Sequence, residues 1–364
     1  MTQNKVNIDL SNKTILITGG AGFVGAALIM RLLKESKAST IVNIDNVNNF
    51  YDTKLKQYRL DLIENAAKES SVNYVFIKGG IADNNLLRNT FTNYKPSIVV
   101  NLAAQAGVEY AADHPDAYLE SNIIGFYGIL QSCRYSYGNG HNGVEHLIFA
   151  SSNSVYGDNK DIPYRVEGKA DTPVSLYGAT KRSNELYAYT YSKLYGIPTT
   201  GLRLFSVYGP AGRPDMFYYN ATEKLTQDKN IALFNYGNHK RDMIYIDDVV
   251  DGILKAMVKA PERTTGEDGL PAAPYALYNL GSGTSIEQHD FMNTLQDELI
   301  NAEVLPQDFD FEAHKKYVGM KLGDIPVTCA DITAFEEDFG FKPTTDLKTG
   351  LGAFAKWYKK YYKI

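Results

Sequence analysis

The sequence has few cysteines and no long apolar run, and these two shortages exclude several classes of protein. Only Cys133 and Cys329 occur in 364 residues, so a disulfide framework is not expected. No apolar run approaches the ~18–20 residues that a membrane span needs. The opening residues, MTQNKVNIDLSNKT, lack a basic stretch followed by an apolar core, so we expect no signal peptide and a cytoplasmic location.

Histidine and net charge are also low. The six His are scattered, with no HExxH motif and no Cys-His cluster, so no metal site is expected. A formal net charge of −5 and a pI near 5.8 give no reason to expect nucleic acid as a partner. With 44% hydrophobic and 22% charged residues, the chain is typical of a soluble globular protein, and its length of 364 residues suggests two domains or one large domain with an attached smaller one.

Short apolar strands alternate with helical segments through the first two hundred residues. Strands are expected at Thr14–Thr18, Thr40–Asp45, Val72–Ile77, Ser97–Leu102, His146–Ala150 and Thr199–Phe205. Helices are expected in FVGAALIMRLLKES and at Asp52–Lys68, Asn84–Asn93, Ala117–Tyr135 and Ser175–Tyr195. This alternation predicts an α/β fold with a doubly wound parallel sheet, a Rossmann-type domain.

The composition changes after about residue 206, where loops rich in Gly, Pro, Asp and Tyr separate short helices. We expect residues 1–206 to form the Rossmann domain, with 236–260 returning to it. Residues 207–364 are expected mainly to form a smaller C-terminal α/β substrate-binding domain. Residues 262–275 (ERTTGEDGLPAAPY) indicate an exposed, mobile loop, and 136–143 (SYGNGHNG) indicate a surface turn.

A glycine motif at the end of the first strand predicts a dinucleotide site. Gly19, Gly22 and Gly25 form G-x-x-G-x-x-G, followed by a helix that begins near Phe23 and Val24. Glycines there permit a tight turn and close approach of the backbone to a pyrophosphate, which the helix N-terminus attracts. Asp45 ends the next strand, where a carboxylate suits an adenosine ribose and repels a 2′-phosphate. The motif therefore favours NAD over NADP.

Tyr177 and Lys181 lie one helical turn apart and predict a catalytic pair. Tyr-x-x-x-Lys occurs six times in the chain, so the spacing alone decides nothing. Here the pair follows Ser151 and Ser152, which end a strand at the edge where ligands of open α/β sheets bind. A free Tyr has a pKa near 10, and a neighbouring cation lowers it and makes the phenolate a usable base.

The combination resembles the extended short-chain dehydrogenases/reductases, and within them the UDP-glucuronate 4-epimerase family. The similarity runs from about Thr14 to Tyr358 and includes IDNVNNFYDTKLKQYRL, NLAAQAGVEYAADHPDAYLESNIIG, the segment GPAGRPDM and LGDIPVTCAD. It implies that Tyr177 removes the proton of the sugar 4-hydroxyl while hydride passes to NAD+. Ser152 would bind the reacting hydroxyl. A 4-keto sugar then turns over and regains hydride on its other face.

The resemblance also implies the remaining contacts. NAD is expected to contact, besides the glycine motif, Asp45, Tyr177 and Lys181, the residues Asn46, Ile81, Leu102, Ala103, Ala104 and Asn122. The UDP-sugar is expected to contact Ser151, Ser152, Ser206, Arg213, Arg241, Lys321 and Asp324. Arg241 would bind the diphosphate and Asp324 the uridine ribose, and Arg213 suits a uronate carboxylate.

Some positions depart from the relatives and leave the sugar open. Glu109 stands where the family segment GVRYS has Arg, which weakens a uronate and favours a neutral UDP-hexose. Gly80 replaces an Asp that contacts adenine, so NAD is expected to be held less tightly. Asn153 and Ser154 stand where dehydratases carry Asp-Glu, and decarboxylases carry a Glu two residues before the Tyr of the VYG element, so both reactions are disfavoured.

Several interpretations therefore remain. The first is a 4-epimerase that makes UDP-galacturonate from UDP-glucuronate. The others are a 4-epimerase of UDP-glucose or UDP-N-acetylglucosamine, a UDP-glucuronate decarboxylase, and a non-catalytic NAD(H)-binding regulator. The resemblance also implies a homodimer, with apolar candidates for its interface at Leu119, Ile123, Phe126, Tyr127, Leu130, Leu186 and Tyr189.

Overall fold

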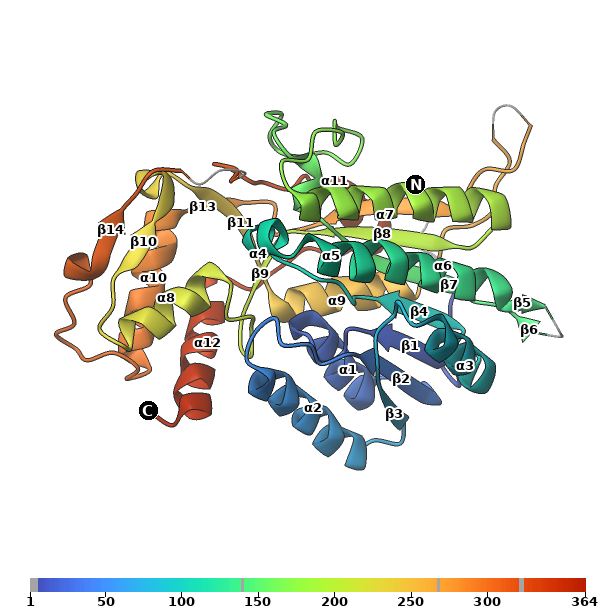
Figure 1. The fold of residues 1–364 in the computed structure, drawn as a ribbon, viewed down its shortest axis with the longest axis horizontal. Coiled ribbons are helices and arrows are strands. Elements are labelled where there is room, and N and C mark those ends of the chain that lie inside the picture. Colours follow the sequence, from blue (N-terminus) through green and yellow to red (C-terminus); the bar gives the residue numbers. More distant parts are fainter. Residues whose placement is uncertain (1–5, 139–140, 267–268, 321–323) are drawn as a thin grey trace.

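A parallel sheet forms the centre of the larger part of the molecule (Figure 1). The computed structural model describes residues 6–138, 141–266, 269–320 and 324–364. In this part of the chain the sheet has seven strands, namely β1 (Thr14–Thr18), β2 (Thr40–Asp45), β3 (Asn73–Lys78), β4 (Ile98–Asn101), β7 (His146–Ser152), β8 (Thr199–Leu204) and β12 (Tyr275–Leu280). Their order is β12-β8-β7-β4-β1-β2-β3, which confirms the doubly wound Rossmann-type fold.

Helices cover both faces of this sheet. One face carries α1 (Phe23–Glu35), α2 (Thr53–Lys68) and α9 (Ile246–Met257), and the other carries α3 (Asn84–Tyr94), α6 (Phe126–Tyr135) and α7 (Leu176–Tyr195). Because side chains of a strand alternate between faces, Ile15 and Ile17 of β1 join the core around α1, whereas Leu16 joins the core around α6. Both faces are apolar, as parallel sheets require.

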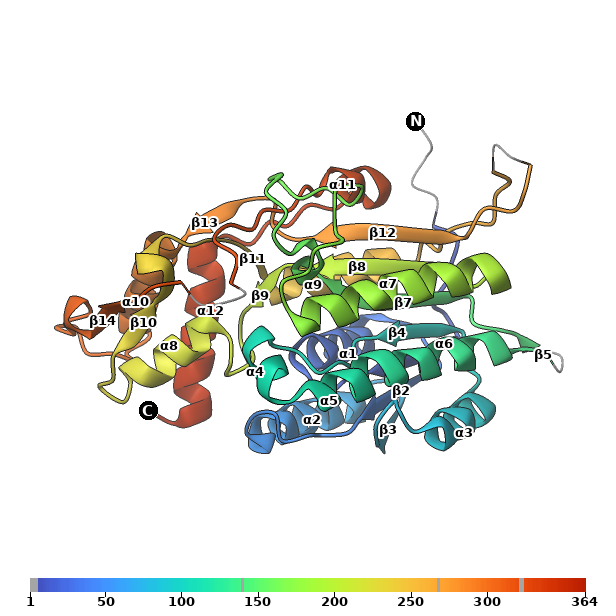
Figure 2. The same ribbon diagram turned by 45° about the horizontal axis from the view of Figure 1, so that its top comes forward.

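The C-terminal part contributes a second core beside the carboxyl ends of the strands. Its helices are α8 (Phe217–Leu225), α10 (Gln288–Asn301) and α12 (Leu347–Tyr362), and its short strands are β9 (Ser206–Tyr208), β10 (Ile231–Leu233), β11 (Lys240–Tyr245), β13 (Ser285–Glu287) and β14 (Lys315–Tyr317). Figure 2 shows these elements gathered on one side of the sheet. Trp357 of α12 packs against α2, and its Nε1 donates to Tyr58 Oη at 3.3 Å.

The strands expected up to residue 205 lie within two residues of the observed ones, but β12 was not foreseen. Residues 246–257 of the expected returning segment pack on α1 and β7 as α9, whereas β11 pairs with β9 and β13 outside the large sheet. A further segment returns as β12, which pairs in parallel with β8. α11 (Thr333–Phe339) packs on β12. The division into domains stays a prediction, and β12 and α11 belong with the Rossmann part in this arrangement.

The segment expected as one helix at Ala117–Tyr135 is built from three pieces. α5 (Pro115–Tyr118) leads into a π-helical stretch, η1 (Leu119–Gly125), and then into α6. A short helix that the sequence did not predict, α4 (Val108–Asp113), precedes them. At the expected surface turn, β5 (Tyr137–Gly138) pairs antiparallel with β6 (His141–Asn142).

Three general properties of the described residues bear on function. None of their helices is long and apolar enough to cross a membrane. No group of three or more His, Cys, Asp or Glu side chains among them is arranged to hold a metal ion. Cys133 is buried and Cys329 partly buried, and neither forms a disulfide.

Candidate active site

The glycine motif forms a turn that fits a diphosphate. Gly19 has a φ of +78°, which favours glycine, and its amide donates to Ile44 O at 2.8 Å. A Cβ at Gly25 would lie 2.3 Å from Gly19 O, so only glycine permits this packing of α1 on β1. No side chain caps the first turn of α1, which leaves its N–H groups available to an anion.

Asp45 is fixed at the edge of the same cavity. One carboxylate oxygen accepts from Ala21 N at 2.9 Å and the other from Val47 N at 2.8 Å. The bond from Ala21 ties the carboxyl end of β2 to the glycine turn, and the bond from Val47 closes the first turn of the following loop. Each carboxylate oxygen retains a lone pair, so Asp45 can still accept bonds from a ribose. The geometry is therefore that of an NAD site.

A buried lysine that the sequence did not single out lies beside this edge. Lys56 Nζ donates to Asn48 O at 2.8 Å and to Asn48 Oδ1 at 2.6 Å. Burial lowers the pKa of Lys56 to about 8, against the opposing charge of Asp45. Lys56 thus holds the loop that follows β2.

The other residues expected at the cofactor line the cavity, with one exception. The lining includes Phe23, Val24, Asn46, Ile81, Leu102, Ala103 and Ala104. Asn122 is buried behind this wall, where it accepts from Gln105 N at 2.8 Å and donates to Gln105 O at 3.0 Å. Gly80 also lines the cavity, and a Cβ there would meet no atom within 4 Å. The space of the missing Asp is therefore open.

Tyr177, Lys181 and Ser152 meet at the other end of the cavity. Ser175 caps α7 by accepting from Gly178 N at 3.0 Å, which places Tyr177 in the first turn. Lys181 Nζ donates to Ala150 O at 2.9 Å and lies 5.9 Å from the centre of the Tyr177 ring. The structure thus brings the expected pair together beside the strand end that carries Ser152.

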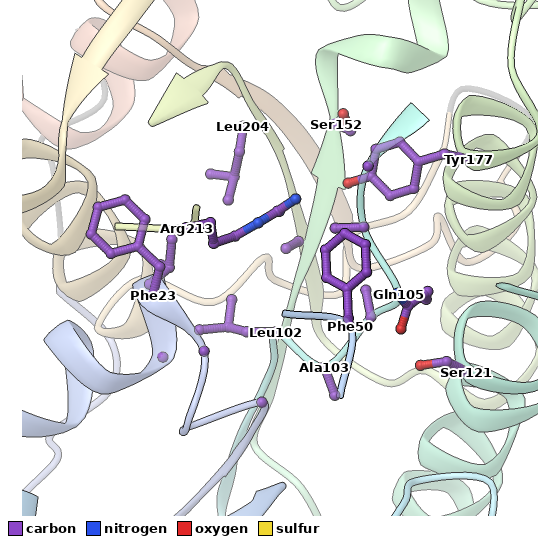
Figure 3. Close-up of a pocket in the computed structure, with 18 of the residues that line it drawn as sticks. Phe23, Phe50, Leu102, Ala103, Gln105, Ser121, Ser152, Tyr177, Leu204 and Arg213 are labelled. Atoms are coloured by element: carbon purple, nitrogen blue, oxygen red, sulfur yellow. The ribbon is translucent and has the colours of Figure 1, made fainter. Parts of the chain in front are cut away.

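The charges around Tyr177 differ from the sequence expectation. Burial raises the pKa of Tyr177 above its ordinary value, while the Arg213 charge and a hydrogen bond with Ser152 act in the opposite direction without offsetting it. Burial also lowers the pKa of Lys181 to about 8. Figure 3 shows the Tyr177 hydroxyl and the Arg213 guanidinium pointing toward each other across the cavity. Arg213 is therefore the cation that acts on Tyr177 from across the cavity.

Arg213 is paired in this arrangement. Its Nε donates to Asp215 Oδ1 at 3.0 Å and its Nη2 to the other carboxylate oxygen, and its Cζ lies 5.8 Å from the centre of the Phe50 ring. Asp215 and Phe50 line the cavity, as does Ser206, but the sequence singled out only Arg213 and Ser206. GRPDM carried a signal for Asp215, because it stands two residues after the Arg.

Ser151 and Ser152 make different contacts. Successive strand residues point to opposite faces, and the Ser151 hydroxyl donates to Glu185 Oε1 at 2.6 Å. Arg203 donates to both Glu185 oxygens, at 2.8 and 2.9 Å. The Ser152 hydroxyl accepts from Ser154 N at 3.1 Å, donates to Asn153 Oδ1 at 3.5 Å and is hydrogen-bonded with Tyr177. Of the two, Ser152 is the one directed at the reacting end.

Arg241 and Asp324 lie outside the lining of this cavity and pair with each other. Arg241 Nη2 donates to Asp324 Oδ1 at 2.8 Å, and His239 Nε2 lies 3.1 Å from Asp324 Oδ2. Burial opposes ionisation of Asp324, but the His239 hydrogen bond and the Arg241 charge outweigh it and lower its pKa. Lys321 and the side chain of Glu109 lie outside the described part of the chain.

Several known proteins resemble this chain in sequence or in fold. Residues 15–269 match the family model described as the NAD dependent epimerase/dehydratase family. Protein CapI of Staphylococcus aureus is 40% identical over 96% of this chain and 99% of its own length. UDP-glucuronate 4-epimerase 4 of Arabidopsis thaliana is 39% identical over 96% of this chain and 76% of its own. The crystal structure of the Bacillus cereus UDP-glucuronic acid 4-epimerase with UDP-glucuronic acid and NAD superimposes with a TM-score of 0.80, at 27% identity, over 96% of this chain and all of the other.

Proposed function

Because the chain belongs to the NAD dependent epimerase/dehydratase family, we propose that it is an NAD-dependent UDP-sugar 4-epimerase that interconverts UDP-glucuronate and UDP-galacturonate. The observation that carries the proposal is the meeting of Tyr177, Lys181 and Ser152 at one end of a cavity whose other end is a glycine turn. Arg213 faces Tyr177 there and supplies a cation for a sugar carboxylate.

The residues of the cavity fit NAD. The uncapped amides of α1 suit its diphosphate, and Asp45 suits its adenosine ribose. When bound, NAD+ would supply the oxidant for C4 of the sugar, take hydride there and return it to the opposite face. Its positive ring would also lower the pKa of Tyr177, which burial alone raises.

The side chains of the protein handle the proton. Tyr177 accepts the proton of the 4-hydroxyl and later returns it, and Ser152 holds the same oxygen by a hydrogen bond. Arg213 favours the phenolate from across the cavity, and Lys181, fixed by Ala150 O one helical turn away, would add positive charge beside it. No net redox change occurs. The 4-keto uronate is a β-keto acid, so a fixed carboxylate is needed to disfavour loss of CO2.

The carboxylate contact is the finer part of the proposal. Arg213 would bind the uronate carboxylate either after releasing Asp215 or while still paired with Asp215. Ser206 lines the same end of the cavity. Arg241 and Asp324 would then bind the diphosphate and the uridine ribose, with Lys321 and the backbone near Ser151 completing the site. The similarity of the chain to UDP-glucuronate 4-epimerases supports UDP-glucuronate as substrate.

Glu109 and the Arg213–Asp215 pair favour a second candidate, a 4-epimerase of a neutral UDP-hexose such as UDP-glucose or UDP-N-acetylglucosamine. A paired Arg213 offers less net positive charge to a carboxylate than a free one. A UDP-glucuronate decarboxylase is disfavoured because Asn153 and Ser154 carry no acid. A non-catalytic NAD(H)-binding regulator would not need the preserved Tyr177–Lys181 pair.

The test is incubation of the purified protein, with no added cofactor, with UDP-glucuronate and, in a separate reaction, with UDP-glucose. Chromatography and proton NMR would resolve the sugar nucleotides. We expect UDP-galacturonate to form reversibly without CO2. A UDP-pentose with CO2 would make the protein a decarboxylase. Conversion of UDP-glucose alone would select the neutral sugar, and no conversion with added NAD+ would leave the regulator.

We also propose a homodimer and a cytoplasmic location. Of the expected interface residues, Leu119, Tyr127, Leu186 and Tyr189 are exposed on α7 and on the helical stretch beside it, Ile123 is partly buried, and Phe126 and Leu130 lie in the protomer's own core. Leu186→Glu should convert the dimer to a monomer in analytical ultracentrifugation, whereas Ile364→Glu, an exposed apolar position elsewhere, should not. A monomeric parent protein would overturn the dimer.

A further inference from the structure

Gln105 presents an unpaired amide nitrogen in the wall of the active-site cavity. The side chain is 4% exposed and lines the cavity between Phe50 and Ser121 (Figure 3). Its Oε1 accepts from Asn48 Nδ2 at 3.1 Å. No described side chain or backbone group accepts a hydrogen bond from Nε2. A buried donor without an acceptor destabilises a fold, so an acceptor on the ligand is the natural partner.

A neighbouring cation fixes which way the Gln105 amide points. The oxygen and nitrogen of an amide are otherwise assigned only from their partners. Lys56 Nζ donates to Asn48 Oδ1, and an ammonium group has no acceptor to offer in return. The Asn48 nitrogen must therefore face Gln105 and donate, and the Gln105 side-chain oxygen must accept that hydrogen bond. The unpaired group is consequently the N–H2 donor.

The backbone of Gln105 is also held by hydrogen bonds. Asn122 bonds both to the amide and to the carbonyl of Gln105, and its Nδ2 also donates to Thr180 Oγ1 at 3.0 Å. Thr180 precedes Lys181 on α7, and its hydroxyl donates to Tyr177 O at 2.8 Å. The backbone of Gln105 cannot shift without breaking bonds that reach the catalytic helix.

We propose that Gln105 is a binding residue whose Nε2 donates a hydrogen bond to a sugar hydroxyl oxygen of the bound ligand. Two sugars would lie near Tyr177, namely the nicotinamide-side ribose of NAD and the hexose of the UDP-sugar. The choice of these two rests on the proposed function. Either contact orients a sugar ring beside Tyr177. The hydrogen bonds from Lys56 to Asn48 and from Asn48 to Gln105 hold the Gln105 amide so that its nitrogen faces the ligand.

Two substitutions separate the donor from its surroundings. Gln105→Glu keeps an oxygen for Asn48 but replaces the free donor with an acceptor. Gln105→Met removes the donor without adding charge, and removes the Asn48 bond as well. Gln227→Glu is the matched control, because Gln227 is exposed, lies outside the cavity and also accepts a hydrogen bond, from Lys229. Calorimetry would give the Kd of NAD+ for each full-length variant and the Kd of UDP-glucuronate for each NAD-loaded one.

We expect both Gln105 variants to weaken the same ligand by roughly tenfold, with Gln227→Glu unchanged. Weaker NAD+ binding would place the acceptor on the ribose, and weaker UDP-glucuronate binding would place it on the hexose. If only Gln105→Glu weakens ligand binding, the cause is the added charge. If only Gln105→Met weakens it, the cause is loss of the hydrogen bond with Asn48. Either result, or no effect, overturns the proposal. The NAD+ measurement stands even where no UDP-sugar is converted.

Discussion

Replacing Arg203 with Met tests the buried ion pair that fastens the catalytic helix to the sheet. Glu185 lies one turn after Lys181 on α7, and its carboxylate accepts two bonds from Arg203 of β8 and one from Ser151 of β7. The side chains of Glu185 and Arg203 are 1% and 2% exposed, so water does not screen them. The Arg203 Cζ also lies 4.7 Å from the centre of the Tyr156 ring.

The cost in unfolding free energy follows from the contacts that the Glu185 carboxylate keeps after the substitution. Arg203→Met keeps most of the volume but leaves a buried carboxylate with Arg182 and Ser151 as its remaining described donors. Loss of one member of such a pair costs about 3–5 kcal/mol of unfolding free energy, a large share of a typical total of about 5–15 kcal/mol. Glu185→Gln should cost a similar amount, because the guanidinium then lacks its counter-charge.

Urea unfolding followed by circular dichroism at pH 7 measures this cost. The double variant with Glu185→Gln and Arg203→Met has no uncompensated buried charge, because Arg182 is partly exposed, so its loss should fall short of the sum of the single losses by about 2 kcal/mol. A loss below about 1 kcal/mol for Arg203→Met, or strict additivity in the double variant, would refute the assignment of this pair as the fastening of α7.

Three further outcomes are expected. Tyr177→Phe should lower kcat by about 10²- to 10⁴-fold while NAD released on denaturation stays at the parent level; joint loss of NAD would count against a role in proton transfer. Gly25→Ala should abolish NAD binding, since its Cβ would lie 2.3 Å from Gly19 O; a full NAD content in the variant would contradict this. Burial lowers the pKa of His146 from 6.5 to about 4, so between these values the unfolded chain binds the proton and the folded one does not. The contribution of His146 to the unfolding free energy is fully present above pH 6.5 and falls by about 3 kcal/mol as the pH drops to 4. Urea titrations at pH 7 and 4.5 should therefore show a smaller loss of unfolding free energy for His146→Gln than for the parent protein. Equal losses would exclude His146 as the cause.

Strong local patterns explain why much of the sheet could be predicted. Thr14–Thr18 and Thr40–Asp45 are short apolar runs bounded by polar or glycine residues, and the structure has strands at those bounds. β12 (YALYNL) follows a long polar loop and is not followed at once by a helix that packs on the sheet, as in a βαβ unit. The local pattern therefore did not indicate that this strand pairs with β8. α4 begins at Val108 after Gly107, which provides no side-chain cap, and its six residues are too few for helical periodicity to be visible.

The site was predictable where a motif fixes the backbone and not where side chains choose partners. The glycine turn and the Tyr177–Lys181 spacing specify local geometry, and both are found as expected. The pairing of Arg213 with Asp215 depends on loop conformation, which composition does not encode. Asn122 was expected at the cofactor, but its amide satisfies the backbone of Gln105 from behind the wall, a choice that only tertiary contacts reveal.

The single tryptophan has a consequence for spectroscopy. Trp357 is the only indole in the chain, so all tryptophan emission originates on α12, at its contact with Tyr58 of α2. The ring also stacks on Tyr361, with centroids 5.1 Å apart. Any rearrangement that separates α12 from α2 exposes this indole and shifts its emission to longer wavelength. The protein therefore carries a native optical probe of the seam between its C-terminal part and its cofactor-binding part.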